Sequence, residues 1–442
     1  MDHGATTRRV PRVFQWSILV LMLGALESWP QDSRQAGPPF FLGVWVGADA
    51  FAWGDLKGMG KDSASTIQAI CKDLADIGCN VVWVSGFAPF FAEKPLMKTW
   101  LDTAQKHGLR VVLQGSGFPY CIPKGEEEVL ARTRQEVIPF WEDIARTYRA
   151  HPALLAYCPV EEIGDNVELG EAPTVEALAE VGQAVAKVDP EHPVVTIHIA
   201  AWINVARKEV ELRQRRLGIL IADLYVFTHV HEWSDPNSAW KTAEDATKGF
   251  LDWTQQYAAL AASARVPLWM FGQANETIWT RKLNGRLESK KNFKMPGEVE
   301  MRFQVWAALL SGAKGLLLFP YTSNPQPPEE TRATLEEWEY GIGMRTLEGK
   351  PTASHAGLRA VGQKFKQDWP LMGRLEPTGD PIEIDMVVGR RFRDPQDNSG
   401  HVMLLNRDLS RARKPSPELL KRFALSFSGE LAPGDGVRLE PK

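Results

Sequence analysis

The stretch Leu154-Leu-Ala-Tyr-Cys-Pro-Val-Glu-Glu-Ile-Gly-Asp165 joins a short apolar run to two adjacent carboxylates. An apolar run without polar alternation is typical of a strand that is buried on both faces, as in a parallel sheet covered by helices. Glu161 and Glu162 directly follow this expected strand. Taken alone, the stretch is equally compatible with a functional site at a strand end and with a solvated loop that begins with two glutamates. The rest of the sequence distinguishes these two interpretations.

Seven further apolar runs recur along the chain, at residues 40–46, 80–84, 109–113, 194–198, 219–227, 266–270 and 315–319. Segments with helical periodicity separate many of them, such as residues 65–77, 174–186 and 301–310. Eight strand–helix units predict a (β/α)8 barrel, with a doubly wound open sheet as the alternative. No Gly-rich phosphate loop follows the first run, which disfavours the open sheet. In a barrel, chemistry is assembled where strands end, which favours a functional role for the two glutamates.

The two ends of the chain differ in residue pattern from the expected barrel, which spans residues 38–372. Residues 382–388, 401–406 and 423–427 alternate or are rich in β-formers, and turn residues separate them. We therefore expect a small antiparallel β-sandwich-like domain over residues 373–442. Residues 1–37 are expected to be a signal peptide or N-terminal anchor plus a linker.

The expected signal begins with Arg8, Arg9 and Arg12, which precede the apolar run 18–26. A basic region before a short apolar run is typical of a secretory signal, and the run is short for a membrane span. No clean small-x-small cleavage site follows, so an uncleaved anchor is the alternative. These features predict a secreted or periplasmic protein with no membrane contact beyond that anchor.

Charge and cysteine content exclude some classes of partner. The net charge of −4 includes no basic block of the kind that tracks a phosphate backbone, so nucleic acid is not an expected partner. The four cysteines allow three pairings, and Cys121 with Cys158 would follow or end neighbouring strands. Neither Cys-x2-Cys nor His-x3-His spacing occurs, so we expect no metal and no other cofactor.

Polar and aromatic residues follow the expected strands and are candidates for contacting a substrate in a cleft. For any single residue, packing in the core or solvation of a loop explains its position about as well as contact with a substrate does. Many of the sixteen tryptophans must fill the core. The candidates for substrate binding are Trp45, Asp49, Ser85, Gln114, Glu161, His198, Trp202, His229, His231, Gln273 and Tyr321.

Over roughly residues 38–372 the chain resembles the large clan of retaining (β/α)8 glycoside hydrolases, which contains β-galactosidase-like and cellulase-like enzymes. Residues 76–84, 187–194 and 312–319 look like the clan's second, fifth and eighth strands, in that order. Val160-Glu-Glu162 stands where the clan places Asn-Glu or Asp-Glu after strand four. The resemblance implies a carbohydrate substrate, with Glu162 as general acid/base and Glu161 as its substrate-binding neighbour.

The chain departs from the clan after strand seven, where the clan's nucleophile is a glutamate. Gly272 and Gln273 stand at about that place, and an amide cannot form a glycosyl ester. Glu276 is the expected replacement as second catalytic carboxylate, with Glu232 and Asp49 as alternatives. Because strands four and seven face each other across a barrel, Gln273 is expected to point toward Glu162.

Three functions are compatible with these patterns. The first is a glycoside hydrolase that acts on a poly- or oligosaccharide of plant or microbial type. The second is a non-catalytic carbohydrate-binding barrel, suggested by Gln273. The third is a metal-dependent hydrolase that recruits His198, His229 and His231 with Asp49. The basic segment 275–296 is expected to be a solvated loop or, alternatively, a lid that favours anionic sugars.

Overall fold

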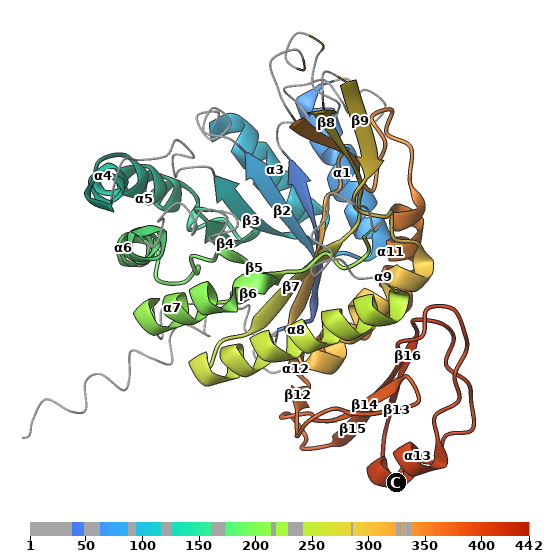
Figure 1. Cartoon of the computed structure of the whole chain (residues 1–442). Helices are drawn as coiled ribbons and strands as arrows, with labels where there is room; N and C mark the ends of the chain where they lie inside the picture. Colours follow the sequence, from blue (N-terminus) through green and yellow to red (C-terminus); the bar gives the residue numbers. More distant parts are fainter. Residues whose placement is uncertain are drawn as a thin grey trace, which may run out of the picture.

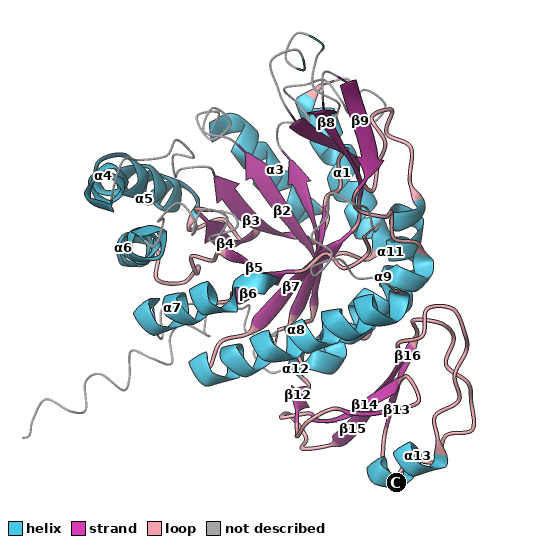
Figure 2. Cartoon of the chain, in the orientation of Figure 1, coloured by secondary structure: helices cyan, strands magenta, loops and turns pink. Residues whose placement is uncertain are grey.

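The computed structural model describes residues 38–47, 62–86, 94–115, 126–160, 173–213, 218–228, 242–283, 286–323, 329, 332 and 337–441. Within these ranges a parallel sheet surrounded by helices is followed by a smaller antiparallel sheet (Figures 1 and 2). The expected signal peptide or anchor lies outside the described residues. No helix in the described ranges is both long and apolar enough to cross a membrane.

The parallel sheet has eight strands in the order β4-β3-β2-β1-β10-β7-β6-β5. They are β1 (Phe41–Gly47), β2 (Val81–Gly86), β3 (Arg110–Gly115), β4 (Leu154–Cys158), β5 (Ile197–Ile199), β6 (Leu220–Asp223), β7 (Leu268–Gln273) and β10 (Gly315–Phe319). The two ends of this order also meet, because the amide of Tyr157 donates to Pro193 O at 2.9 Å and the amide of Val195 donates to Tyr157 O at 2.7 Å. The sheet therefore closes, which confirms the predicted barrel.

Helices follow the strands around the outside of the barrel (Figure 2). They are α1 (Ser63–Ile77), α3 (Lys94–Lys106), α4 (Glu126–Arg132), a π-helical segment (Thr133–Val137), α5 (Ile138–Tyr148), α6 (Pro173–Val188), α7 (Ile203–Arg213), α8 (Ala243–Ala264), α9 (Glu298–Ser311), α11 (Ala353–Phe365) and α12 (Trp369–Arg374). The bounds of α1 follow from its caps: Ser65 N donates to Asp62 Oδ1 at 2.7 Å, and Gly78 ends the helix with a φ of 103°.

Alternate residues of each strand point into the barrel and form an apolar interior. Trp83 and Phe271 lie edge to face there, with ring centroids 5.2 Å apart. Trp269 occupies the space beside Gly315, where an added Cβ would lie 2.8 Å from the indole ring. The interior cluster is Phe41, Val81, Trp83, Val112, Leu155, Ala156, Cys158, Val195, Ile197, Ile219, Ile221, Trp269, Phe271 and Leu317.

Strand six is shorter than its apolar run predicted. The run 219–227 is continuously apolar except for Asp223, yet β6 ends at that residue. Leu224, Val226 and Phe227 are buried in the outer core instead of continuing the sheet. An apolar run indicates that residues are buried, not that they form a strand. It therefore overestimates the length of a strand that is followed by a buried loop.

The basic segment after β7 forms an exposed hairpin instead of the predicted loop, and its alternative role as a lid stays a prediction. Strands β8 (Glu276–Leu283) and β9 (Arg286–Lys291) pair with each other, and β11 (Glu337–Ile342) pairs with β8. This three-stranded antiparallel sheet lies at the opposite end of the molecule from the C-terminal sheet (Figure 1).

The C-terminal region contains one antiparallel sheet and a short helix, so the sandwich-like prediction is corrected to a single described sheet. Its strands are β12 (Glu376–Pro377), β13 (Ile382–Ile384), β14 (Val387–Arg393), β15 (Gly400–Asn406) and β16 (Gly436–Leu439). Residues 423–427, predicted as a strand, begin with Phe423, the last residue of α13 (Pro417–Phe423). The sheet is joined to α9 by Trp306, whose Nε1 donates to Asp435 Oδ1 at 3.0 Å.

Candidate functional site at the barrel mouth

Four aromatic rings gather where the barrel strands end. Trp45 of β1 and Phe319 of β10 have ring centroids 4.8 Å apart. Tyr225, in the loop after β6, stacks on Phe319 at 5.8 Å and contacts Phe293 edge to face at 5.4 Å. All four side chains are half-buried, and together we call them the aromatic shelf. The sequence predicted Trp45 but missed the other three, because Phe319 and Tyr225 lay within apolar runs assigned to strands.

Gln114 on β3 holds two indole rings at this mouth. Its Oε1 accepts hydrogen bonds from Nε1 of Trp45 at 3.1 Å and from Nε1 of Trp83. Trp83 is fully buried opposite Trp45 in the strand register, and Ser85 on β2 is half-buried opposite Gln114. The Gln114 carbonyl oxygen therefore orients the two rings, and its direct contact with substrate stays a prediction.

Asp223 at the end of β6 was missed by the sequence analysis. It is 7% exposed and lies opposite Phe271 in the sheet register. It is also the only acidic residue in the eight parallel strands. The signal was available: Ile219 and Ile221 face the interior, so the alternation continues to Asp223. Because residues 219–227 are almost all apolar, the sequence alone did not show which of them face the interior.

Gln273 is fully buried at the end of β7, and main-chain groups engage its amide. Nε2 donates to Phe227 O at 2.9 Å and to Lys294 O at 2.8 Å, while Oε1 accepts from Phe227 N at 2.9 Å. The side chain thus ties the loop after β6 to the segment after β9. These bonds occupy the groups that were expected to reach across the cleft to a sugar, so the structure gives Gln273 a bracing role.

A side chain at Gly272, next to Gln273, would have to displace the Gln304 amide. A Cβ there would lie 2.5 Å from Oε1 of Gln304 on α9. The same Oε1 accepts from Gln273 N at 2.7 Å, and Gln304 Nε2 donates to Gln273 O at 3.0 Å. The backbone at the clan's nucleophile position is therefore fixed by a buried amide instead of presenting a carboxylate.

Glu276, the expected second carboxylate, is the first residue of β8. Its Oε1 lies 2.9 Å from Nζ of Lys291 on β9, and its side chain is 17% exposed. The ion pair links two strands of the hairpin, so a cation already neutralises this carboxylate. The catalytic role of Glu276 remains a prediction.

His198 points out of the barrel, in contrast to its predicted place in the cleft. Its neighbour Ile197 belongs to the interior cluster, so His198 faces helix α7, where its Nε2 contacts Glu209 Oε2. Both side chains are fully buried, and Thr196 Oγ1 also donates to Glu209, at 2.9 Å. This cluster fastens β5 to α7 away from the mouth.

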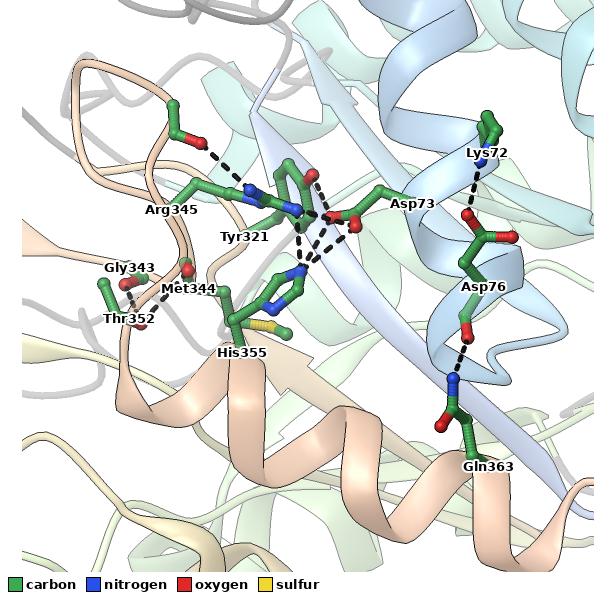
Figure 3. A network of polar contacts seen from close by, with 11 residues as sticks. Lys72, Asp73, Asp76, Tyr321, Gly343, Met344, Arg345, Thr352, His355 and Gln363 are labelled. Carbon is green, nitrogen blue, oxygen red and sulfur yellow. Dashed lines mark hydrogen bonds and ion pairs between the residues drawn. The ribbon is translucent and has the colours of Figure 1, made fainter.

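The Tyr321 side chain also points away from the predicted cleft. It is fully buried, and its hydroxyl donates to Asp73 Oδ2 on α1 at 2.6 Å (Figure 3). Arg345 NH2 lies 2.7 Å from Asp73 Oδ1, and His355 Nε2 lies 2.9 Å from Oδ2. The prediction that Tyr321 contacts substrate is therefore corrected, because its hydroxyl belongs to this buried polar cluster.

The cluster keeps Asp73 ionised. Burial alone would raise the pKa of Asp73, but hydrogen bonds from His355, Arg345 and Tyr321 outweigh burial and hold the pKa well below its ordinary value. Burial and the Asp73 charge raise the pKa of Tyr321 well above its ordinary value. Tyr321 therefore stays a neutral donor and Asp73 a charged acceptor at neutral pH.

Several predicted residues lie outside the described residues and stay predictions: Asp49, Glu161, Glu162, His229, His231 and Glu232, together with the side chain of Trp202. Cys121 lies there too, so its pairing with Cys158 stays a prediction. Burial raises the pKa of the Cys71 thiol to about 12, which makes it unreactive. Within the described ranges, no group of three or more His, Cys, Asp or Glu residues is placed to hold a metal ion.

Comparison with known proteins bears on the fold. No family model and no curated sequence matches the chain. The β-galactosidase from the psychrophilic Marinomonas ef1 is similar in structure, with a TM-score of 0.53 and 14% identity over 74% of this chain and 59% of that chain. The endo-β-1,4-mannanase from Thermotoga petrophila has a TM-score of 0.51 and 11% identity over 84% of this chain and 96% of that chain.

A third similar structure is the exo-β-1,4-mannosidase Op5Man5 from Opitutaceae bacterium strain TAV5, with a TM-score of 0.50 and 15% identity over 75% of this chain and 60% of that chain. The chain thus spans 59% and 60% of the β-galactosidase and mannosidase chains. At these identities the likeness concerns the fold: the chain has the (β/α)8 barrel fold of these three glycoside hydrolases.

Proposed function

We propose that this protein is a glycoside hydrolase that cleaves a poly- or oligosaccharide at the carboxyl ends of its barrel strands. The aromatic shelf is the observation that carries the proposal. Its four half-buried rings line the strand ends where (β/α)8 enzymes place their substrates. Flat rings bury the apolar faces of pyranose rings, while neighbouring polar groups such as Ser85 and Asp223 fix hydroxyls.

Glycoside hydrolysis needs a general acid, which we assign to Glu162 because of its place in the motif after β4. The acid protonates the leaving oxygen while a second carboxyl group acts on the opposite side of the sugar ring. Glu276 is the candidate from the sequence for that second role. Proposed substrates are β-linked galactosides and mannosides, as the names of the similar structures suggest, and export is the proposed localisation.

The test is sugar release from a panel of 4-nitrophenyl β-galactoside, β-mannoside, β-glucoside and β-glucuronide together with mannan and galactan. We expect wild-type turnover on at least one substrate and a loss of about a thousandfold in Glu162→Gln. Glu211→Gln, an exposed glutamate on α7, is the matched control and should keep full turnover. Full turnover in Glu162→Gln would remove Glu162 from the mechanism.

A non-catalytic carbohydrate-binding barrel is the second candidate, and the main-chain hydrogen bonds of the Gln273 amide favour it. In such a protein the nucleophile position serves the fold, and the aromatic shelf alone supplies affinity. Calorimetry against the same glycans separates the two functions. Heat of binding without any released sugar supports the binding protein and contradicts the hydrolase.

A further inference from the structure

We propose that Thr277 is a positioning residue of the sugar-binding surface. It holds Phe293, the outer ring of the aromatic shelf, in place for a sugar unit next to the one that is cleaved. The inference rests on the proposed glycosidase function and deepens it, because it assigns a substrate with more than one sugar ring. Thr277 is 6% exposed and acts through Phe293.

Phe293 differs from the other shelf rings in its origin. Trp45 and Phe319 belong to the barrel strands β1 and β10, whereas Phe293 follows β9, outside the eight parallel strands. Phe293 contacts the ring of Tyr225 edge to face at 5.4 Å, and Tyr225 stacks on Phe319 at 5.8 Å. Two successive ring contacts therefore separate Phe293 from the strand ends. Phe293 extends the shelf beyond the barrel strands, so its position depends on the β8–β9 hairpin.

The main chain of Phe293 is fixed by Thr277 at both of its polar groups. Thr277 Oγ1 accepts a hydrogen bond from Phe293 N at 3.2 Å, and Thr277 N donates to Phe293 O at 3.3 Å. The next amide, that of Lys294, donates to Phe227 O at 2.8 Å in the loop after β6. These bonds fix the two planar peptide units that flank the Cα atom of Phe293. The direction in which its ring leaves the main chain is thereby set.

Packing against a glycine orients the Thr277 hydroxyl. Thr277 lies opposite Gly341 of β11 in the sheet register. A Cβ added at Gly341 would lie 3.2 Å from Thr277 Cγ2, so a larger residue there would press on this methyl group. Because a side chain branched at Cβ has few allowed rotamers, placing its methyl group also directs its hydroxyl. Gly341 therefore leaves Thr277 Oγ1 free to face the Phe293 amide.

A second threonine of the same strand separates this role from plain stabilisation of the hairpin. Thr280 on β8 is also buried, and its Oγ1 lies 2.8 Å from Ser289 Oγ on β9. That contact links the two strands of the hairpin to each other and does not involve Phe293. A change of Thr280 therefore removes a comparable hydrogen bond from the hairpin while it leaves the contacts of Phe293 in place.

The experiment uses the full chain with two substrates of one sugar, namely the 4-nitrophenyl monosaccharide and the linear tetrasaccharide on which the wild type is most active. Thr277→Val keeps the shape of the side chain and removes the hydroxyl. We expect KM for the tetrasaccharide to rise about fivefold, with kcat and the constants for the monosaccharide within about twofold of wild type. Thr277→Ser should recover most of the loss, and Thr280→Val should match the wild type on both substrates.

Phe293→Leu tests whether Thr277 acts through the ring. It removes the flat surface at a half-buried position and should raise KM for the tetrasaccharide at least as much as Thr277→Val does. Because the two changes then affect one contact, the double variant should be no worse than Phe293→Leu alone. Additive losses would show that Thr277 acts by another route and would overturn the inference.

The other outcomes separate this inference from the proposed function. An unchanged KM for the tetrasaccharide in Thr277→Val overturns the inference and leaves the hydrolase standing, as do equal losses on both substrates. If Thr277→Val does not fold, an unchanged KM in Phe293→Leu overturns it. No sugar release by the wild type contradicts the proposed function itself. Calorimetry with the same variants then tests the inference through Kd for the tetrasaccharide, and absence of binding by the wild type overturns it.

Discussion

The hydroxyl of Tyr321 lies 2.6 Å from Oδ2 of Asp73, although 248 positions separate the two residues in the chain. The contact joins the segment after the eighth barrel strand to the first helix, which belongs to the other end of the barrel sequence. Arg345 and His355 reach the same carboxylate from the segment before α11 and from α11 itself (Figure 3). One half-buried carboxylate thus fastens the last βα unit to the first.

Because the pKa of Asp73 is lowered in the folded protein, its ionisation contributes stability above the ordinary carboxyl pKa of about 3.9. That contribution is lost as the pH falls from this value toward the lower folded-state pKa. We expect the free energy of unfolding to fall more steeply below about pH 4 in the wild type than in Asp73→Asn. Urea titrations at a series of pH values measure both slopes.

The difference between the two proteins isolates Asp73, because all other carboxylates titrate in both. Asp76→Asn is a suitable control, since this neighbouring aspartate is exposed and paired with Lys72 on the surface of α1. Its pH profile should match that of the wild type. Parallel profiles for wild type and Asp73→Asn would show that the cluster does not depend on the charge of Asp73.

Gln273→Glu would restore a carboxylate near the clan's nucleophile position, yet we expect it to destabilise the protein without raising turnover. The change removes both N–H donors and places a charge beside the carbonyl oxygens of Phe227 and Lys294. Leaving a buried charge without compensation costs about 3–5 kcal/mol. Urea unfolding at neutral pH measures the loss, and Gln105→Glu on the exposed face of α3 is the control. A stable variant with higher turnover would contradict the bracing role of Gln273.

Gln114→Ala should weaken sugar binding, because Trp45 and Trp83 both lose the acceptor of their indole N–H groups. We expect about tenfold weaker binding, equivalent to roughly 1.4 kcal/mol, as the Trp45 ring leaves its orientation. Gln114→Glu keeps an acceptor oxygen and should recover most of the affinity. Tryptophan fluorescence titration with the best glycan measures each Kd. Equal affinities in all three proteins would exclude a positioning role for Gln114.

The fold could be predicted from the sequence, whereas the orientation of individual site residues could not. Eight apolar runs locate the strands, because burial on both faces gives a continuous signal, and helical periodicity locates helices between them. In such continuous apolar runs, polar and apolar residues do not alternate, so the sequence does not tell which side chains face the barrel interior. His198 and Tyr321 were therefore assigned to the cleft although they face the helices, and Asp223 was overlooked although it faces the interior.

Glu276 is the second catalytic carboxylate that the sequence predicts, yet its side chain is paired with Lys291 across the β8–β9 hairpin. The Glu276–Lys291 pair is half exposed on the Lys291 side, so it contributes at most about 1 kcal/mol to stability. If the pair is structural, Glu276→Gln and Lys291→Met should both fold and keep kcat within about threefold of wild type.

The two variants also test the opposite assignment. If Glu276 is the second catalytic carboxylate, Glu276→Gln loses turnover by about a thousandfold, while Lys291→Met, which keeps the carboxylate, loses much less. Steady-state kinetics of Glu276→Gln and Lys291→Met on one aryl glycoside decide between a structural and a catalytic role of Glu276. Loss of turnover in Glu276→Gln alone would place the catalytic role in the hairpin, and full turnover in both variants would leave the Glu276–Lys291 pair a structural contact.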